Sequence, residues 1–183
     1  MGKVYQKINF PYTDEIQKYI NAEMEKFCSE NFYVKVIELP EPLKISINRY
    51  LNSNGLSDVR NPTVFKHKNS IMSHTKVHID SIDSVPTHCS IILPICGTQN
   101  TKHYWYCGDY HTIMSVKQNI IYEQIVWDTT PKLIDSIEIS NGVFLTKADI
   151  PHGASSNSDY RITATFRFSQ NESFDYISRK LSN

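Results

Sequence analysis

The sequence predicts a mainly β fold of the α+β class, in which N-terminal helices cover a β-rich core. From about residue 62 onward, short runs of β-branched and aromatic residues alternate with turn residues, which is typical of strands. Helical hydrophobic periodicity is found only before that point. Because no helical pattern separates the runs, an antiparallel sandwich or barrel is favoured over βαβ units.

Length and composition suggest one folded domain. The chain has 183 residues, with 40% hydrophobic and 11% aromatic side chains, enough to bury a core and to exclude a disordered protein. We predict a single domain over 1–183, with a mixed helix and strand cover at 1–61, the β core at 62–170 and a tail at 171–183. The 19 basic and 19 acidic residues balance, which argues against nucleic acid or an anionic membrane as the main partner.

The N-terminal part is predicted to contain two helices and one strand. An apolar stripe at helical spacing predicts a first helix capped by Thr13 or Asp14. A strand-like run follows at 32–37. Residues 43–51 are expected to form a short second helix that ends near Gly55.

The β core is predicted to consist of short strands joined by turns. Ser140-Asn141-Gly142 joins two of them, since Asn-Gly is a strong hairpin signal. The strands are expected near 76–80, 88–95, 103–107, 120–127, 133–139, 143–147 and 160–168.

Targeting and cysteine patterns indicate a cytoplasmic protein. The N-terminus lacks the apolar region of a secretory signal, and no apolar stretch approaches the length of a membrane span. The four cysteines form no C-x-x-C pair, so we expect them to be small, reduced core residues.

Three short motifs carry the chemistry. In His78-Ile79-Asp80, the histidine and the carboxylate project from the same face of a strand. His152 follows 72 residues beyond Asp80, and Arg161 follows nine residues after His152. Arg161 and Thr163 share one face of the last predicted strand, and a cation that points into a barrel needs an anion there. The packed face of that strand is predicted to carry Ile162, Ala164, Phe166 and Phe168.

Two histidines and one carboxylate make a facial triad that suits Fe(II) oxygen chemistry. With the arginine downstream, the motif order over residues 74–168 resembles the Fe(II)/2-oxoglutarate-dependent dioxygenases, specifically the small stand-alone members. The resemblance implies a double-stranded β-helix (jelly roll) for the core. It also implies an enzyme that couples the oxidative decarboxylation of 2-oxoglutarate to the hydroxylation of a small-molecule or peptidyl substrate.

The same resemblance implies roles for individual residues. His78, Asp80 and His152 would bind Fe(II). Arg161 would pair with the distal carboxylate of 2-oxoglutarate, and Thr163 would offer a hydroxyl beside it. Either Tyr104 or Tyr106 would donate a further hydrogen bond to that carboxylate, and alternation puts both tyrosines on one face.

Two other functions remain open at this stage. One is a cupin-like metal enzyme, in which Arg161 would bind the substrate itself. The other is a catalytically silent jelly-roll protein with a binding or structural role. Three further histidines, His74, His103 and His111, are expected to lie outside the ligand set, with structural or rim roles for the last two. The substrate and the oligomeric state are not indicated by the sequence.

Overall fold

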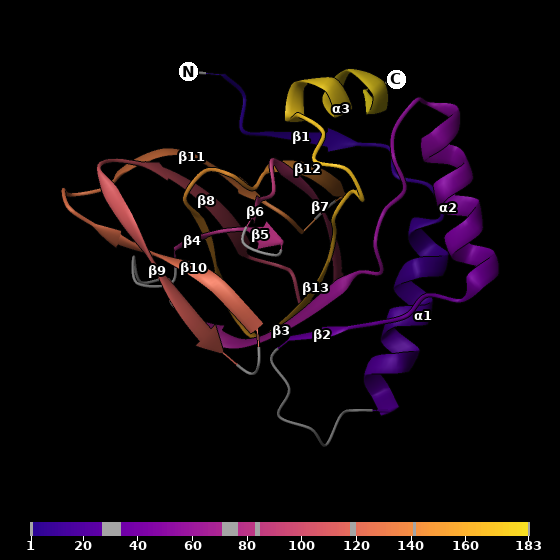
Figure 1. Ribbon diagram of the computed structural model, residues 1–183. Coiled ribbons are helices and arrows are strands. Elements are labelled where there is room, and N and C mark those ends of the chain that lie inside the picture. The colour runs from indigo at the N-terminus through magenta and orange to yellow at the C-terminus, as the bar shows by residue number, and fades with distance from the viewer. Residues whose placement is uncertain are drawn as a thin grey trace.

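The computed structural model describes residues 2–26, 34–70, 77–82, 85–117, 120–140 and 142–182, and it confirms a mainly β protein (Figure 1). The helices within these ranges are α1 (Thr13–Lys26), α2 (Glu41–Ser53) and α3 (Phe174–Leu181). The strands are β1 (Tyr5–Ile8), β2 (Val34–Val36), β3 (Thr63–Ser70), β4 (His78–Ile79), β5 (Ser81–Ile82), β6 (Val85–Pro86), β7 (Cys89–Cys96), β8 (Thr101–Cys107), β9 (Tyr110–Lys117), β10 (Ile120–Trp127), β11 (Lys132–Glu138), β12 (Val143–Lys147) and β13 (His152–Phe166).

Antiparallel pairing joins the strands throughout the described residues. The main path through the larger sheet runs β1-β12-β7-β13-β4-β10-β9. Two branches leave β13, because it also pairs with β3, which carries β2, and with β8, which carries β11. Strands β5 and β6 form a separate small hairpin.

The long strand β13 connects the two parts of this sheet. Residues 152–156 pair with β8. Further along the strand, residues 160–165 pair with β3 on one side and residues 162–166 pair with β7 on the other. The register against β3 shifts between Ser156 and Tyr160. Fifteen residues in extended conformation reach about 50 Å, so a single strand can serve both parts. His152 and Arg161 therefore lie on the same strand but in different parts of the sheet.

The two faces of β13 differ as the alternation predicts. Its apolar residues, together with Phe168, belong to the largest hydrophobic cluster. Arg161, Thr163 and Thr165 occupy the opposite face and are nevertheless buried, with 5%, 5% and 9% of their surface exposed. A polar face that is buried to this extent requires polar partners in the interior.

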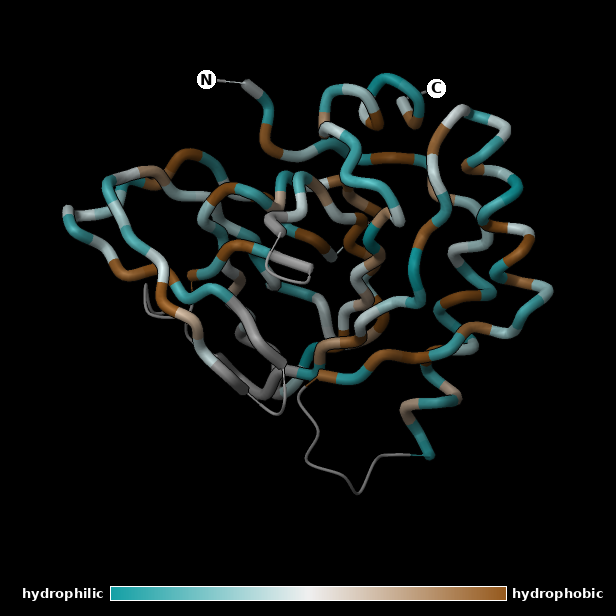
Figure 2. Tube along the Cα trace, viewed as in Figure 1, coloured by the Kyte–Doolittle hydropathy of each residue, from teal (hydrophilic) through white to brown (hydrophobic). Residues whose placement is uncertain are grey.

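Helices cover the apolar face of the sheet. Helix α1 packs against β7, and α3 packs against β12 and β1 (Figure 1). Figure 2 shows hydrophobic residues recurring between hydrophilic ones along the two N-terminal helices, which is the amphipathic pattern of a helix packed on one side. The fully buried members of this layer are Ile16, Ile20, Ile47, Leu51, Ile177 and Leu181.

The helix ends differ from the sequence prediction. Helix α1 starts at Thr13, so neither Thr13 nor Asp14 precedes the helix as a cap. The Thr13 hydroxyl donates a hydrogen bond to the Phe10 carbonyl at 2.8 Å, and Tyr12 has a positive φ of 57°. The chain thus turns sharply before the helix rather than entering it through a side-chain cap.

Helix α3 and strands β1, β3, β5, β6 and β9 are absent from the sequence prediction. The residues of α3 fall in the predicted tail, although Ser173 caps it by accepting a hydrogen bond from the Tyr176 amide. Its buried residues, Phe174, Ile177 and Leu181, follow a helical spacing that would have revealed it. Strand β9 could not be predicted from hydrophobic periodicity, because it is largely exposed and carries little apolar pattern.

The structure tests the predictions about membrane spans and cysteines within the described residues. No helix in the described ranges combines the length and the apolar content that a membrane crossing requires. Cys89, Cys96 and Cys107 are not joined by disulfides. Cys28, His74 and Asn141 lie outside the described residues, so the predictions about them stay predictions.

Candidate metal centre

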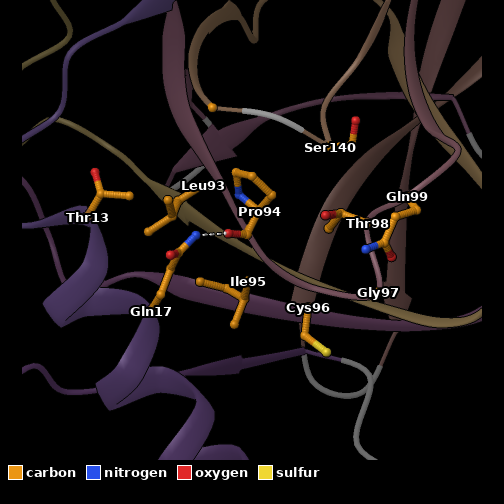
Figure 3. A pocket seen from close by; sticks show the side chains of 11 residues that line it. Thr13, Gln17, Leu93, Pro94, Ile95, Cys96, Gly97, Thr98, Gln99 and Ser140 are labelled. Carbon is orange, nitrogen blue, oxygen red and sulfur yellow. Dashed lines mark hydrogen bonds between the residues drawn. The ribbon is translucent and has the colours of Figure 1, made fainter.

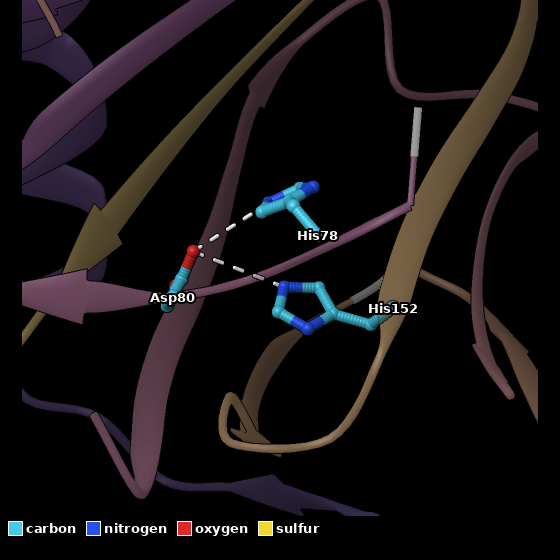
Figure 4. A group of neighbouring side chains, drawn as sticks. All are labelled: His78, Asp80 and His152. Carbon is cyan, nitrogen blue, oxygen red and sulfur yellow. Dashed lines mark ion pairs between the residues drawn. The ribbon is translucent and has the colours of Figure 1, made fainter. Parts of the chain in front are cut away.

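Three side chains from two strands converge on one point in the sheet (Figure 4). His78 lies on β4, Asp80 follows that strand, and His152 opens β13. Direct pairing of His152 with His78 across the antiparallel strands brings the two imidazoles to the same side. One ligand atom from each of the three residues lies within 4.8 Å of the others.

The carboxylate of Asp80 stands between the two imidazoles. Its Oδ1 atom lies 3.5 Å from His78 Nε2 and 3.9 Å from His152 Nε2. The ring centroids of the histidines are 4.6 Å apart. The side chains of His152 and Asp80 are 7% and 11% exposed, whereas that of His78 is 35% exposed. The cluster is therefore closed on the His152 side and open to solvent at His78.

His152 is held in the form that binds a metal. Its Nδ1 lies 2.8 Å from the Ile150 carbonyl, an acceptor, so Nδ1 carries the proton and donates it. The lone pair is then on Nε2, the atom that faces Asp80. Burial lowers the pKa of His152 to about 4, and the neighbouring His78 contributes in the same direction. At neutral pH the imidazole is uncharged, as metal binding requires.

Asp80 is ionised although it is buried. Burial by itself would raise the pKa of its carboxyl, but the Arg167 guanidinium, followed by the two histidines, holds that pKa well below its usual range. Arg167 Nη2 lies 3.3 Å from Asp80 Oδ2. The two carboxylate oxygens are thus divided, with Oδ2 toward Arg167 and Oδ1 toward the histidines. Backbone hydrogen bonds to Ala148 and from Thr87 fix the residue.

The donor set fits a divalent transition metal. Two neutral imidazole nitrogens and one carboxylate oxygen are the ligands of a facial triad, which leaves three of six positions open. With metal–ligand bonds of about 2.1 Å, ligands at right angles lie about 3 Å apart. The distances from Asp80 Oδ1 to the two imidazoles are 3.5 and 3.9 Å, so small movements of the side chains would complete the site.

Both predicted tyrosines lie on the side of β8 that faces away from this cluster. Directly paired residues of β8 and β13 share a side of the sheet, and Trp105 pairs with His152 while Tyr104 pairs with Gly153. Tyr104 and Tyr106 therefore lie on the face opposite to the His152 side chain. The Tyr104 hydroxyl instead accepts a hydrogen bond from Ser155 at 3.3 Å. Tyr106 packs in a separate cluster with Val77, Ile79 and Ile125.

His103, unlike the two tyrosines, lies on the face of β8 that points toward the cluster. It pairs with Ala154, and its ring centroid lies 5.2 Å from that of His152. Burial, followed by the charges of His152 and Arg161, holds the pKa of His103 well below its usual value. The sequence predicted a structural or rim role for His103 and could not place it more closely, because only the register between β8 and β13 shows which face of β8 is inside.

A separate cavity lies outside the cluster. Its volume is about 330 Å³, and it is bounded by α1, the end of β7, the loop that follows β7 and the turn before β12 (Figure 3). The Gln17 side chain donates a hydrogen bond to the Pro94 carbonyl there, at 2.7 Å. None of the three clustered residues lines this cavity. The choice of ligands, and not cavity size, therefore identifies the metal centre.

Comparison with known proteins adds little to this geometry. No protein-family model matches the sequence, and no curated protein matches it. A crystal structure of a prolyl-4-hydroxylase from Pseudomonas putida aligns with 92% of this chain and 93% of its own, at 12% identity and a TM-score of 0.37. At that TM-score the likeness establishes neither a shared fold nor a family, so the function is argued from the site alone.

Proposed function

We propose that this protein is a non-haem Fe(II) dioxygenase that uses 2-oxoglutarate as its co-substrate and hydroxylates an organic substrate. The observation that carries the proposal is the convergence of His78, Asp80 and His152, with Arg167 held against Asp80. The triad supplies three protein ligands for the metal and leaves positions for a chelating co-substrate and for O2.

The co-substrate site is proposed from the buried polar face of β13. Arg161 and Thr163 are each 5% exposed and lie on the same face of the strand. Recognition of an anion by a buried guanidinium calls for a planar carboxylate, which it can bind through two parallel hydrogen bonds. The distal carboxylate of 2-oxoglutarate fits this requirement, with the Thr163 hydroxyl as a further donor.

The bound Fe(II) and 2-oxoglutarate would supply the oxidation itself, in which 2-oxoglutarate and O2 give succinate, CO2 and a hydroxylated substrate. The chain's own residues prepare the site for this chemistry. The Ile150 carbonyl keeps His152 in the tautomer with a free Nε2. Arg167 keeps Asp80 ionised and holds its Oδ2, so that Oδ1 is presented to the metal position.

The architecture of the core is proposed to be a double-stranded β-helix, or jelly roll, within a single domain. The antiparallel pairing and the sharing of β13 between two parts of the sheet support this arrangement. Substrate is expected to approach from the side of His78, since that ligand is the most exposed of the three. We propose a small molecule or a peptidyl side chain as the substrate, given the balanced charge of the chain.

An anaerobic titration tests the function. Fe(II) and 2-oxoglutarate together should produce a weak visible charge-transfer band, and addition of O2 should yield succinate. His152→Ala should abolish the band, while Arg161→Ala should keep Fe(II) binding and raise the 2-oxoglutarate concentration required. His111→Ala is the matched control, because His111 is exposed, pairs with Asp128 and is not one of the clustered ligands.

The results of this titration distinguish the dioxygenase from the two other candidate functions. Fe(II) binding without a band or succinate would overturn the use of 2-oxoglutarate and would indicate a cupin-like metal enzyme. A protein that binds neither Fe(II) nor 2-oxoglutarate would have to be a silent binding or structural module.

A further inference from the structure

His103 is a buried polar residue whose outer ring nitrogen is unused. The residue is 7% exposed, and Nε2 finds no hydrogen-bond partner among the residues that the structure describes. Folded proteins pair nearly all such atoms, because a buried donor without a partner costs free energy. Because this unpaired nitrogen lies beside a proposed ligand site, we expect the bound ligand to supply its hydrogen-bond partner.

Packing, and not hydrogen bonding, sets the orientation of this ring. His103 stacks on Trp105 with ring centroids 4.7 Å apart and planes inclined by 9°. Trp105 is itself fully buried, and its Nε1 donates a hydrogen bond to the Lys147 carbonyl at 3.0 Å. The imidazole is thus held against a rigid surface, with Nε2 available for a ligand.

His103 lies beside the metal cluster without belonging to it. Its ring centroid is 5.2 Å from that of His152, yet the ligand atoms that gather within 4.8 Å in the described residues come from His78, Asp80 and His152 alone. On β8 it shares the inner face with Trp105, which pairs with His152. The ring therefore lies next to the metal position, on the inner face of β8.

We propose that His103 Nε2 donates a hydrogen bond to the carboxylate that Arg161 binds, so that the two side chains together recognise the distal carboxylate of 2-oxoglutarate. The inference rests on the proposed function. It replaces Tyr104 and Tyr106, which face the other side of β8, with the residue that faces the interior. A carboxylate has enough lone pairs to accept from a guanidinium and an imidazole together.

Binding of two 2-oxo acids to the Mn(II)-loaded protein tests this assignment without any turnover. 2-Oxoglutarate carries the distal carboxylate and pyruvate lacks it, while both can chelate the metal. Three variants are compared with the unaltered chain by calorimetry. His103→Leu removes both ring nitrogens, His103→Asn retains a donor only near the position of Nδ1, and His103→Gln retains one near Nε2.

We expect His103→Leu and His103→Asn to weaken 2-oxoglutarate binding by about 10- to 100-fold, as loss of a hydrogen bond to a charged group predicts. His103→Gln should stay within about threefold of the unaltered chain, since 1.4 kcal/mol corresponds to a tenfold change and a retained donor loses less. Mn(II) affinity and pyruvate affinity should not change in any of the variants.

Each contrary result has a distinct meaning. Equal 2-oxoglutarate affinity in the unaltered chain, His103→Asn and His103→Gln would overturn the role of His103 while leaving the proposed function intact. Pyruvate binding that weakens as much as 2-oxoglutarate binding would overturn the assignment to the distal carboxylate. An unaltered chain that binds Mn(II) but no 2-oxo acid would instead contradict the proposed function itself. If His103→Leu does not fold, the difference in 2-oxoglutarate affinity between His103→Asn and His103→Gln still tests the role of Nε2.

Discussion

Asp80 meets different partners with its two carboxylate oxygens, and this division is the central feature of the site at the scale of single residues. Oδ1 faces both histidines, and Oδ2 lies 3.3 Å from Arg167 Nη2. Because the pair is largely buried, each charge is stable mainly through the other. Arg167 therefore acts on the metal centre as a positioning residue that keeps Asp80 ionised and oriented.

Arg167→Met should lower the free energy of unfolding of the metal-free protein by about 2–4 kcal/mol, because it leaves the Asp80 carboxylate buried without its guanidinium. The double variant Arg167→Met/Asp80→Asn should recover part of this loss, since no uncompensated charge remains. Urea denaturation of the four proteins of the cycle gives the coupling energy, expected at about 1–3 kcal/mol.

Chelator treatment before each measurement removes any contribution from bound metal. Additive losses in the double variant would show that the ion pair contributes nothing to stability.

At the scale of elements, strand β13 and the end of β7 determine where Arg161 lies. Gly97 follows β7 with a positive φ of 63°, and a Cβ atom there would meet the Tyr160 carbonyl oxygen at 2.1 Å and Arg161 Cα at 3.4 Å. Only a residue without a side chain allows the two segments to approach this closely. The turn thus positions the arginine from outside the site.

Gly97→Ala should both destabilise the protein and displace Arg161. We expect a loss of about 2 kcal/mol or more, because backbone strain is added to a clash that no side-chain rotation can relieve. The affinity for 2-oxoglutarate should fall as well, while Mn(II) affinity stays unchanged, since His152 lies at the other end of β13 and the other two ligands lie at β4. Urea denaturation and calorimetry measure the two effects.

Gly55→Ala is the matched control. Gly55 also has a positive φ, of 74°, but its Cβ would have only side-chain atoms at 3.6 Å or more as neighbours. It should cost about 1 kcal/mol through backbone strain alone and leave 2-oxoglutarate binding unchanged. Equal effects of the two substitutions would contradict the proposed role of the close approach at Gly97.

At the scale of the whole molecule, a net charge of zero says nothing about how charges are distributed between surface and interior. The 19 basic and 19 acidic residues cancel over the chain. The interior face of β13 carries Arg161 and ends near Arg167, whereas Asp80 is the carboxylate paired there. A divalent metal bound by the triad would add positive charge, which the proposed dicarboxylate co-substrate would offset. The net charge of the chain is therefore compatible with the anion site proposed at Arg161.

Metal binding should stabilise the whole fold, because the ligands belong to strands that come together only in the folded state. Mn(II) at 100 times its dissociation constant should add about 3 kcal/mol and raise Tm by about 5–10 °C for a domain of this size. Differential scanning calorimetry with and without a chelator measures the shift. His152→Ala should show no such shift and His111→Ala should show all of it. An equal rise in both variants would place the metal elsewhere.

Much of the local structure could be predicted from the sequence. Helices α1 and α2 and most core strands follow from periodicity, and the alternation in β13 correctly separates its buried polar face from its apolar face. Strand β9 and the cap of α1 were missed or misplaced, because exposed strands and sharp turns leave little hydrophobic pattern. Helix α3 was missed although its spacing was readable.

The sequence by itself determined which residue types are available for a metal centre and in what order they occur. His78 and Asp80 share a face because strand residues alternate with a period of two, a purely local rule. Which face of β8 points inward depends on its pairing with β13, so only the tertiary structure shows that His103 faces the cluster while Tyr104 and Tyr106 face away. A one-residue change of register moves every side chain of a strand to the other face, and a register between distant strands is set by the packing of the whole core.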